Sequence, residues 1–179
     1  TEQLKRALIN GRDLAPEHCH VVTLGVDHKR FKPQDQQQAR RELGIDPDAV
    51  VMLYVGGMDQ YHDLSPLLEA LAEIESPQSQ VHLVGDGEYR ERYQQLGDRA
   101  SSIVKFHGKV PHSMVPTYIA SAEVCLAPYP TGGVHGGEVA FSTLKIPEFT
   151  ACARAVISVP SGHILSLIED EKTGFLIDQ

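Results

Sequence analysis

The chain has 179 residues, of which 41% are hydrophobic and 22% are charged, a composition typical of one globular domain with a real core. Its 24 Asp and Glu against 16 Lys and Arg give a net charge of −8, which argues against a nucleic-acid-binding protein. No apolar run approaches the roughly 20 residues of a membrane span, and the charged amino-terminal stretch does not resemble a signal peptide. The scattered cysteines Cys19, Cys125 and Cys152 form no disulfide framework, so we expect a cytoplasmic protein.

Short apolar runs, rich in β-branched residues, predict the strands of the fold. They cover residues 21–24, 50–55, 81–84, 103–106, 124–127, 155–159 and 175–177. Most of these runs are continuous rather than alternating, which is typical of parallel strands that are covered on both faces.

Amphipathic stretches between the apolar runs predict helices. The stretches are residues 64–72, 88–96, 114–120, 146–153 and 164–168, together with a solvated polar helix at 35–41. Alternating strands and helices predict a doubly wound, mostly parallel α/β sheet of about six strands, which is a Rossmann-like fold.

Glycines follow several of the predicted strands, at the edge of the sheet where ligands of parallel α/β folds bind. They are Gly56 and Gly57, Gly85 and Gly87, Gly108, and the pairs at 132–133 and 136–137. Any one of them is explained by a tight turn. Their repetition along one edge favours a ligand that approaches the backbone closely, such as a phosphate held by N–H groups.

The segment 141–151 carries the most chemical information. Ser142 and Thr143 are residue types that begin helices, and Lys145 would follow in the first turn, where the helix dipole disfavours a cation. A bound anion would account for that lysine, and a solvated lysine is the alternative.

Pro147 complicates the start of this helix, because proline inside a helix disrupts it. We therefore expect the helix to begin late, with residues 142–146 as its approach. Glu148 would then lie half buried near the ligand edge, where sugar hydroxyls could donate to it; a surface glutamate is the alternative.

A series of motifs follows in order along the chain. They are G-V-D-x-x-x-F-x-P at 25–33, V-G-G-M-D at 55–59, V-G-D-G-x-x-R at 84–90, V-x-F-x-G-x-V at 104–110, S-x-L-K-x-x-E at 142–148 and D-x-x-T-G-x-L at 170–176. Their order and spacing resemble the C-terminal half of the family 4 (group 1) glycosyltransferases, which have the two-domain GT-B fold. The resemblance covers nearly the whole chain.

The resemblance implies that residues 1–179 are the nucleotide-sugar-binding domain of a hexosyltransferase-type enzyme. The N-terminal acceptor domain, with the catalytic residues, and the C-terminal return helix would lie outside the chain, so we expect the chain alone to be inactive. The donor would be a UDP- or GDP-sugar, with no metal or other cofactor. The acceptor, a glycan or a molecule at the inner face of the membrane, would bind through the other domain.

The resemblance also implies the roles of individual residues. Gly56 and Gly57 would face the diphosphate, the backbone near Val110 the base, and Glu148 the ribose. The full set of candidate binding residues is Gly56, Gly57, His62, Gly85, Val110, Ser142, Thr143, Leu144, Lys145 and Glu148, with Glu138 as a candidate sugar contact.

The chain departs from the family pattern at positions that matter for phosphate binding. The family's phosphate-binding Arg is Gly57 here, and its Lys is His62. The first Glu of its Glu-x7-Glu motif falls on Ala140, although Glu138 is close, and A-x-G-x-P-V is altered at 151–156. Loss of two cations is expected to weaken diphosphate binding or leaving-group stabilisation, unless another cation compensates.

Several functions therefore stay open at this point. The first is a retaining glycosyltransferase, the second is a degenerate, non-catalytic nucleotide-binding module of the same fold, and a nucleotide-sugar epimerase is a third. Lys145, His62 or Arg154 are the candidates to replace the missing cations. The 9 histidines show no metal-ligand spacing, and the P-loop, G-x-S-x-G and complete G-x-G-x-x-G motifs are absent.

Overall fold

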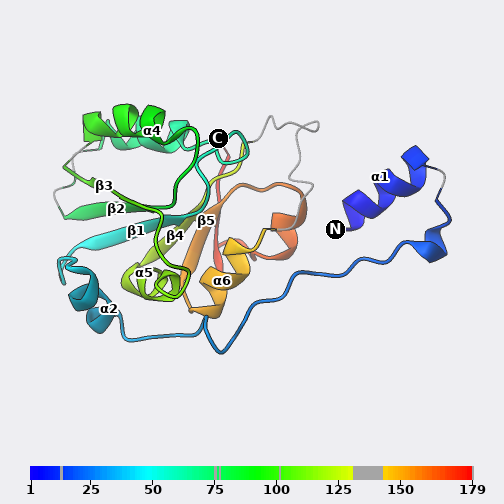
Figure 1. Ribbon diagram of the computed structural model, residues 1–179, viewed down its shortest axis with the longest axis horizontal. Coiled ribbons are helices and arrows are strands. Elements are labelled where there is room, and N and C mark those ends of the chain that lie inside the picture. The colour runs from blue at the N-terminus through cyan, green and yellow to red at the C-terminus, as the bar shows by residue number, and fades with distance from the viewer. Residues whose placement is uncertain (13, 75, 77, 101, 131–142, 179) are drawn as a thin grey trace.

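The computed structural model describes residues 1–179 except residues 13, 75, 77, 101, 131–142 and 179. Its centre is a parallel sheet of six strands in the order β3-β2-β1-β4-β5-β6 (Figure 1). The strands are β1 Val50–Val55, β2 Ser79–Val84, β3 Val104–Gly108, β4 Val124–Ala127, β5 Ala155–Ser158 and β6 Gly174–Leu176. The predicted parallel, Rossmann-like sheet is thus confirmed.

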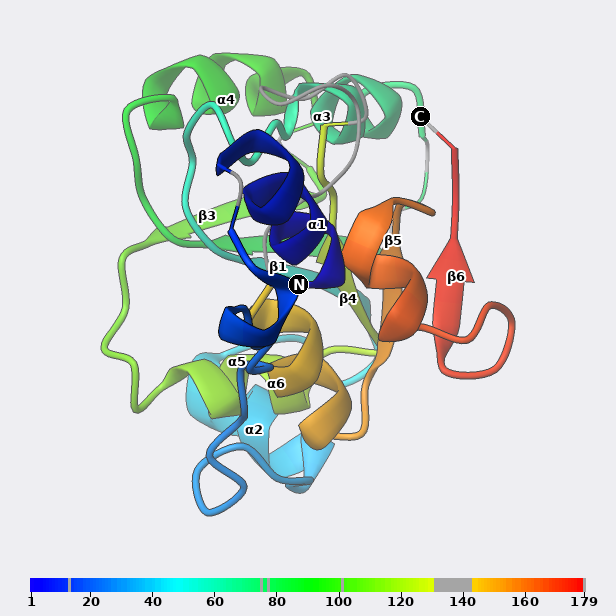
Figure 2. The ribbon, with the colours of Figure 1, turned by 90° about the vertical axis from the view of Figure 1, so that its right-hand side faces the viewer.

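Helices cover both faces of this sheet, and the amino-terminal helix lies apart from it (Figures 1 and 2). The helices are α1 Glu2–Arg12, α2 Gln36–Leu43, α3 Ser65–Leu71, α4 Arg90–Gly97, α5 Val115–Ser121 and α6 Lys145–Ala151, with short 3-10 turns at Pro16–His18, Asp98–Ala100 and Gly162–Ser166. The predicted helix at 164–168 is therefore a 3-10 turn that starts earlier. Among the described residues, no helix has both the length and the apolar character needed to cross a membrane.

Two apolar cores hold the layers together, one on each face of the sheet. Val51 and Leu53 of β1 face the core shared with α5 and α6, whereas Tyr54 faces the core shared with α3 and α4. All three side chains are fully buried. Burial on both faces explains why β1 is a continuous apolar run in the sequence.

The strand order creates one topological switch point, between β1 and β4. From β1 the chain passes through α3 to β2 on one side, and it later returns to place β4 on the other side of β1. The loops that follow β1 and β4 therefore diverge and leave a crevice at the carboxyl edge of the sheet, where parallel α/β folds bind their ligands.

The predicted strand at 21–24 is wrong. These residues belong to none of the strands of the sheet, and the side chain of Val22 is 86% exposed. They belong to a long segment that connects α1 to the rest of the chain (Figure 1), and α1 itself, which the sequence analysis did not predict, buries no residue. An apolar run forms a strand only where a neighbouring strand satisfies its backbone groups.

The start of α6 also differs from the prediction. The helix begins at Lys145 rather than after residue 146, so Pro147 occupies its third position. Proline is tolerated there because the first N–H groups of a helix have no partner within the helix.

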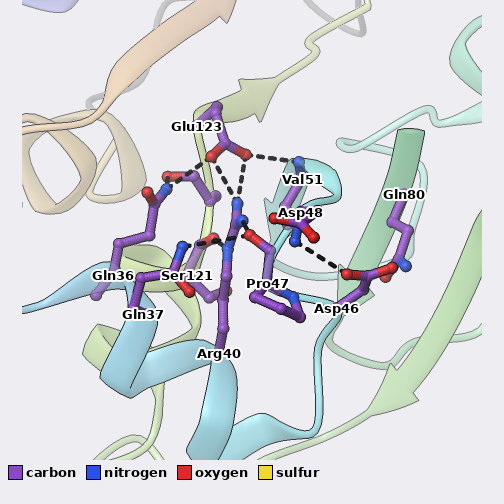
Figure 3. A network of polar contacts seen from close by, with 12 residues as sticks. Gln36, Gln37, Arg40, Asp46, Pro47, Asp48, Val51, Gln80, Ser121 and Glu123 are labelled. Carbon is purple, nitrogen blue, oxygen red and sulfur yellow. Dashed lines mark hydrogen bonds and ion pairs between the residues drawn. The ribbon is translucent and has the colours of Figure 1, made fainter. Parts of the chain in front are cut away.

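Helix α2 is not simply a solvated helix, as the sequence suggested, because it buries Arg40, which is only 3% exposed (Figure 3). The guanidinium donates from Nε to the Ser121 carbonyl at 2.9 Å and from Nη1 to the Pro47 carbonyl at 2.7 Å. Its Nη2 contacts both carboxylate oxygens of Glu123, at 2.6 and 2.7 Å, and Glu123 also accepts from the Val51 N–H at 2.6 Å. This network ties α2 to β1 and to the start of β4.

A chain of hydrogen bonds also joins β2, β3 and α5, beside the core that β1 shares with α5 and α6. The Gln80 Oε1 lies 3.0 Å from His82 Nε2, His82 Nδ1 lies 2.8 Å from His107 Nε2, and His107 Nδ1 lies 3.2 Å from the Tyr118 hydroxyl. Burial lowers the pKa of both imidazoles, which favours their neutral forms. Because the Gln80 oxygen can only accept, a neutral His82 carries its hydrogen on Nε2 and accepts from His107, which in turn accepts from Tyr118.

This arrangement predicts a loss of stability in mild acid. Burial, assisted by His107, Lys105 and Arg40, lowers the pKa of His82 to about 4. The unfolded chain, with a histidine pKa near 6.5, then binds a proton that the folded chain excludes, so the free energy of unfolding falls as the pH drops from about 6.5 towards 4. The full effect is on the order of 3 kcal/mol.

Urea denaturation at pH 7.5 and pH 5 measures this effect, with His82→Gln as the comparison. We expect the glutamine variant, which has no titrating group at this position, to lose less stability than wild type between the two pH values. Parallel losses in the two proteins would show that His82 is not the acid-sensitive group.

Candidate functional site

A cleft of about 430 Å³ opens at the carboxyl edge of the sheet, at the switch point between β1 and β4. Four segments contribute to it: the loop after β1, the loop after β3, Tyr129 shortly after β4, and the start of α6. Its lining includes these residues named from the sequence: Gly56, His62, Thr143, Leu144, Lys145 and Glu148. The folding of the chain thus brings two separate sequence regions, 56–62 and 143–148, to one cleft.

The glycines at this edge have different structural roles. A Cβ on Gly56 would lie 2.6 Å from Lys145 Nζ and 2.7 Å from the Tyr54 hydroxyl, so a larger residue would displace these groups. Gly57 follows, and its carbonyl accepts a hydrogen bond from the Tyr54 hydroxyl at 2.5 Å. Gly85, with φ of 141°, does not line the cleft: a Cβ there would lie 1.8 Å from the Gly56 carbonyl oxygen. Gly85 therefore supports the Gly56 turn from behind.

Lys145 is the most unusual residue in the cleft, because it is only 9% exposed. Its Nζ lies 4.4 Å from the centre of the Tyr54 ring and 5.3 Å from that of Tyr129, and it donates a long hydrogen bond of 3.4 Å to the Tyr54 hydroxyl. In the part of the chain that the structure describes, no carboxylate lies within ion-pair distance of it. The alternative of a solvated lysine is therefore wrong.

Burial lowers the pKa of Lys145 to about 7, although the negative charges of Asp59 and Glu148 oppose the shift. Two aromatic faces stabilise an ammonium group but do not replace an anionic partner. The cleft thus offers a buried cation whose best partner would be an anion entering from outside.

Glu148, on α6, has a side chain that is 18% exposed, so the alternative of a surface glutamate is also wrong. Burial raises its pKa, against the opposing charges of His112, Lys145 and Arg30. Its Oε1 lies 3.9 Å from His112 Nε2, and Arg30 Nη1 lies 2.7 Å from His112 Nδ1. Because the guanidinium can only donate, His112 carries a hydrogen on Nε2, towards the carboxylate.

His62 replaces the family's lysine, but it brings no positive charge to the cleft. Its Nδ1 lies 3.0 Å from Asp59 Oδ1, and burial lowers its pKa. Asp59 also approaches the neighbouring turn, since a Cβ on Gly57 would lie 2.8 Å from Asp59 Oδ2. The region where the family carries two cations therefore holds a neutral imidazole and a carboxylate, which leaves Lys145 as the buried cation.

The remaining candidates lie elsewhere. Val110 packs against the core that β1 shares with α5 and α6 and does not line the cleft. Arg154, just before β5, donates a hydrogen bond to the Ala120 carbonyl at 2.9 Å. Arg154 is therefore not a replacement for the missing cations. Ser142 and Glu138 lie outside the described residues, as does Ala140. Within the described ranges, no three His, Cys, Asp or Glu side chains gather as metal ligands do.

Sequence reasoning missed Tyr54, Tyr129 and His112, which shape the cleft. In the sequence Tyr54 is part of an apolar run, and Tyr129 and His112 lie in the loops after β4 and β3. Their position near strand ends is the sequence signal that could identify them.

Known proteins resemble this chain over most of its length. A family model described as "Glycosyl transferases group 1" matches residues 49–179. A D-inositol 3-phosphate glycosyltransferase of Geodermatophilus obscurus is 30% identical, over 97% of this chain and 40% of the relative. The chain thus spans about two fifths of the length of that curated relative.

Solved structures share the fold. The Anabaena protein Alr3699/HepE, solved in complex with UDP, has a TM-score of 0.76 and 24% identity over 97% of this chain and 47% of that chain. It was also solved with UDP-glucose. The sucrose-phosphate synthase of Thermosynechococcus elongatus has a TM-score of 0.71 and 27% identity, over 99% of this chain and 43% of that chain. In each case the match covers less than half of the solved chain.

Proposed function

Because this chain belongs to the group 1 glycosyl transferase family, we propose that it is the donor-binding part of an enzyme that transfers a hexose from a nucleotide-sugar to an acceptor, with retention at the sugar. The observation that carries this proposal is the cleft at the switch point, where a buried lysine and a half-buried glutamate face the same space. Anionic phosphates suit the lysine, and ribose hydroxyls suit the glutamate.

The geometry suggests how the donor lies in the cleft. The diphosphate would lie between the Gly56–Gly57 turn and residues 143–145, within reach of the Lys145 ammonium. The ribose hydroxyls would donate to Glu148, and the base would extend towards the loop after β3, near Val110 and His112. Because a lysine would supply the positive charge, no metal ion or other cofactor is needed to hold the diphosphate in this proposal.

The N-terminal segment offers a surface for the rest of such an enzyme. Leu4 and Leu8 on α1 are each 43% exposed, and Val22 and Leu24 on the extended segment are 86% and 49% exposed. The relatives are more than twice as long as this chain, so we assign this surface to an N-terminal acceptor domain. That domain would carry the catalytic residues and the glycan or membrane-linked acceptor, in the cytoplasm, which leaves this chain inactive alone.

A non-catalytic nucleotide-binding module of the same family is the second candidate. The observation in its favour is the pair of departures at Gly57 and His62, which leaves Asp59 beside the expected diphosphate. The two candidates share the binding step and differ in transfer by the complete enzyme.

The binding step is tested by Glu148→Ala. Removing the carboxylate deletes one or two charge-assisted hydrogen bonds to the ribose, so we expect the affinity for UDP-glucose to fall about tenfold or more. Calorimetric titration measures the change, and Glu91→Ala on the exposed face of α4 is the matched control.

The possible outcomes separate the claims. Unchanged affinity in Glu148→Ala would refute the ribose assignment. If the wild-type chain binds none of UDP-glucose, GDP-glucose and ADP-glucose at millimolar concentration, the proposed donor site is wrong.

A further inference from the structure

The starting point is the position of the Lys145 ammonium in the wall of the cleft. Its Nζ lies beside the Gly56 backbone and is enclosed by the rings of Tyr54 and Tyr129. Its hydrogen-bond partner among the described residues is the Tyr54 hydroxyl, which itself donates to the Gly57 carbonyl. So placed, the ammonium group is shielded from bulk water, and none of the described carboxylates lies within ion-pair distance of it.

We propose that Lys145 takes up a proton as the diphosphate of the donor binds, so that donor binding and protonation of this lysine are coupled. This inference rests on the proposed function and adds to it how the site recognises charge. The empty cleft keeps the lysine partly neutral, and the diphosphate supplies the anion that makes the charged form favourable.

The groups around the ammonium explain why the pKa of Lys145 lies near neutral pH. Burial disfavours the cation, whereas Asp59 on the loop after β1 and Glu148 on α6 favour it, and the balance leaves the pKa of Lys145 at about 7. Beyond them lie His62, bound to Asp59, and His112, close to Glu148. Tyr54 and Tyr129 stay neutral because burial raises their pKa values.

A diphosphate changes this balance in a known direction. An anion within about 4–6 Å raises the pKa of a cation by about 1–3 units. Because the pKa of Lys145 is about 7 without a donor, some of the chains carry a neutral Lys145 at pH 7, and binding takes up a fraction of a proton. The same linkage makes the affinity fall by up to about tenfold for each pH unit above 7, and makes it nearly constant below pH 6.

Calorimetry in pairs of buffers with different protonation enthalpies measures the proton uptake directly. UDP-glucose is the probe, because its diphosphate is esterified at both ends and carries no group that titrates near neutrality. We expect little uptake at pH 6 and a clearly larger fractional uptake at pH 7 and pH 8, because the lysine is mostly charged before binding only at the lowest of these pH values. Uridine, which has no phosphate, is the matched ligand control, and its binding takes up no proton.

Variants identify the residue that takes up the proton. His62→Gln and Glu148→Gln each remove another titratable group of the cleft, and we expect both variants to retain the uptake at pH 8. Lys145→Met removes it, and the exposed Lys109→Met leaves it unchanged.

The outcomes distinguish this inference from the function on which it rests. Donor binding without proton uptake, or uptake that disappears in His62→Gln or persists in Lys145→Met, overturns the inference and leaves the donor site intact. If wild type binds none of the nucleotide-sugars, the proposed function fails and the inference with it.

Discussion

Arg40→Ala is expected to lower the free energy of unfolding by about 3 kcal/mol at pH 7, because it breaks the network that ties α2 to the sheet. The change removes the Arg40 donor from the buried Ser121 carbonyl and leaves Glu123 without its cation, whereas the exposed Pro47 keeps a hydrogen bond from Gln37 Nε2 at 3.2 Å. Glu123 is 37% exposed, so water screens part of the ion pair, and we expect the buried Ser121 carbonyl to contribute more to the loss.

Urea denaturation at pH 7 measures the effect. Arg41→Ala is the matched control, since the neighbouring side chain on α2 is exposed, and we expect it to change stability by less than about 0.5 kcal/mol. Equal stability of the two variants would show that the Arg40 network does not hold α2 against the sheet.

The sheet could be predicted from the sequence because a strand that is buried on both faces is a continuous apolar run. Residues 50–55 and 81–84 are apolar at nearly every position, and they form β1 and most of β2, two paired interior strands of the sheet. Residues 21–24 are a similar apolar run, but they form no strand. What separates the two cases is a neighbouring strand, which is a property of the fold and not of the run itself.

Part of the site could also be predicted, because some of its residues belong to local sequence patterns. Gly56 after β1 and the Lys145–Glu148 segment belong to local patterns, and the structure brings them to one cleft. The environment of Lys145 was not predictable, because Tyr54 comes from β1 and Tyr129 from beyond β4. Residues 91 positions apart in the chain determine whether this lysine is solvated or buried.

Burial of this lysine, with no carboxylate of the described residues within ion-pair distance, affects the stability of the chain without a donor. The pKa of Lys145 is about 7 in the folded chain, against 10.5 for an ordinary lysine. The unfolded chain therefore binds more protons between these values, and the free energy of unfolding falls as the pH drops from 10.5 to 7. The lysine destabilises the fold at neutral pH, as residues placed for binding often do.

Lys145→Met is accordingly expected to stabilise the empty chain by about 1–4 kcal/mol at pH 7, because methionine fills similar space between Tyr54 and Tyr129 without a buried charge. The gain is greatest at pH 7 and below, and it shrinks towards pH 10.5, where lysine is neutral in both the folded and the unfolded chain. Urea denaturation at pH 7 and pH 9.5 measures it.

The same variant is expected to bind UDP-glucose at least about tenfold more weakly, because the diphosphate loses its charged partner. Lys109→Met, at an exposed position after β3, is the matched control and changes neither stability nor affinity. A Lys145→Met chain that is less stable than wild type at pH 7 would mean that the ammonium already has a strong partner in the empty fold. Stability and donor affinity that move in opposite directions would instead identify Lys145 as a residue retained for binding at the expense of the fold.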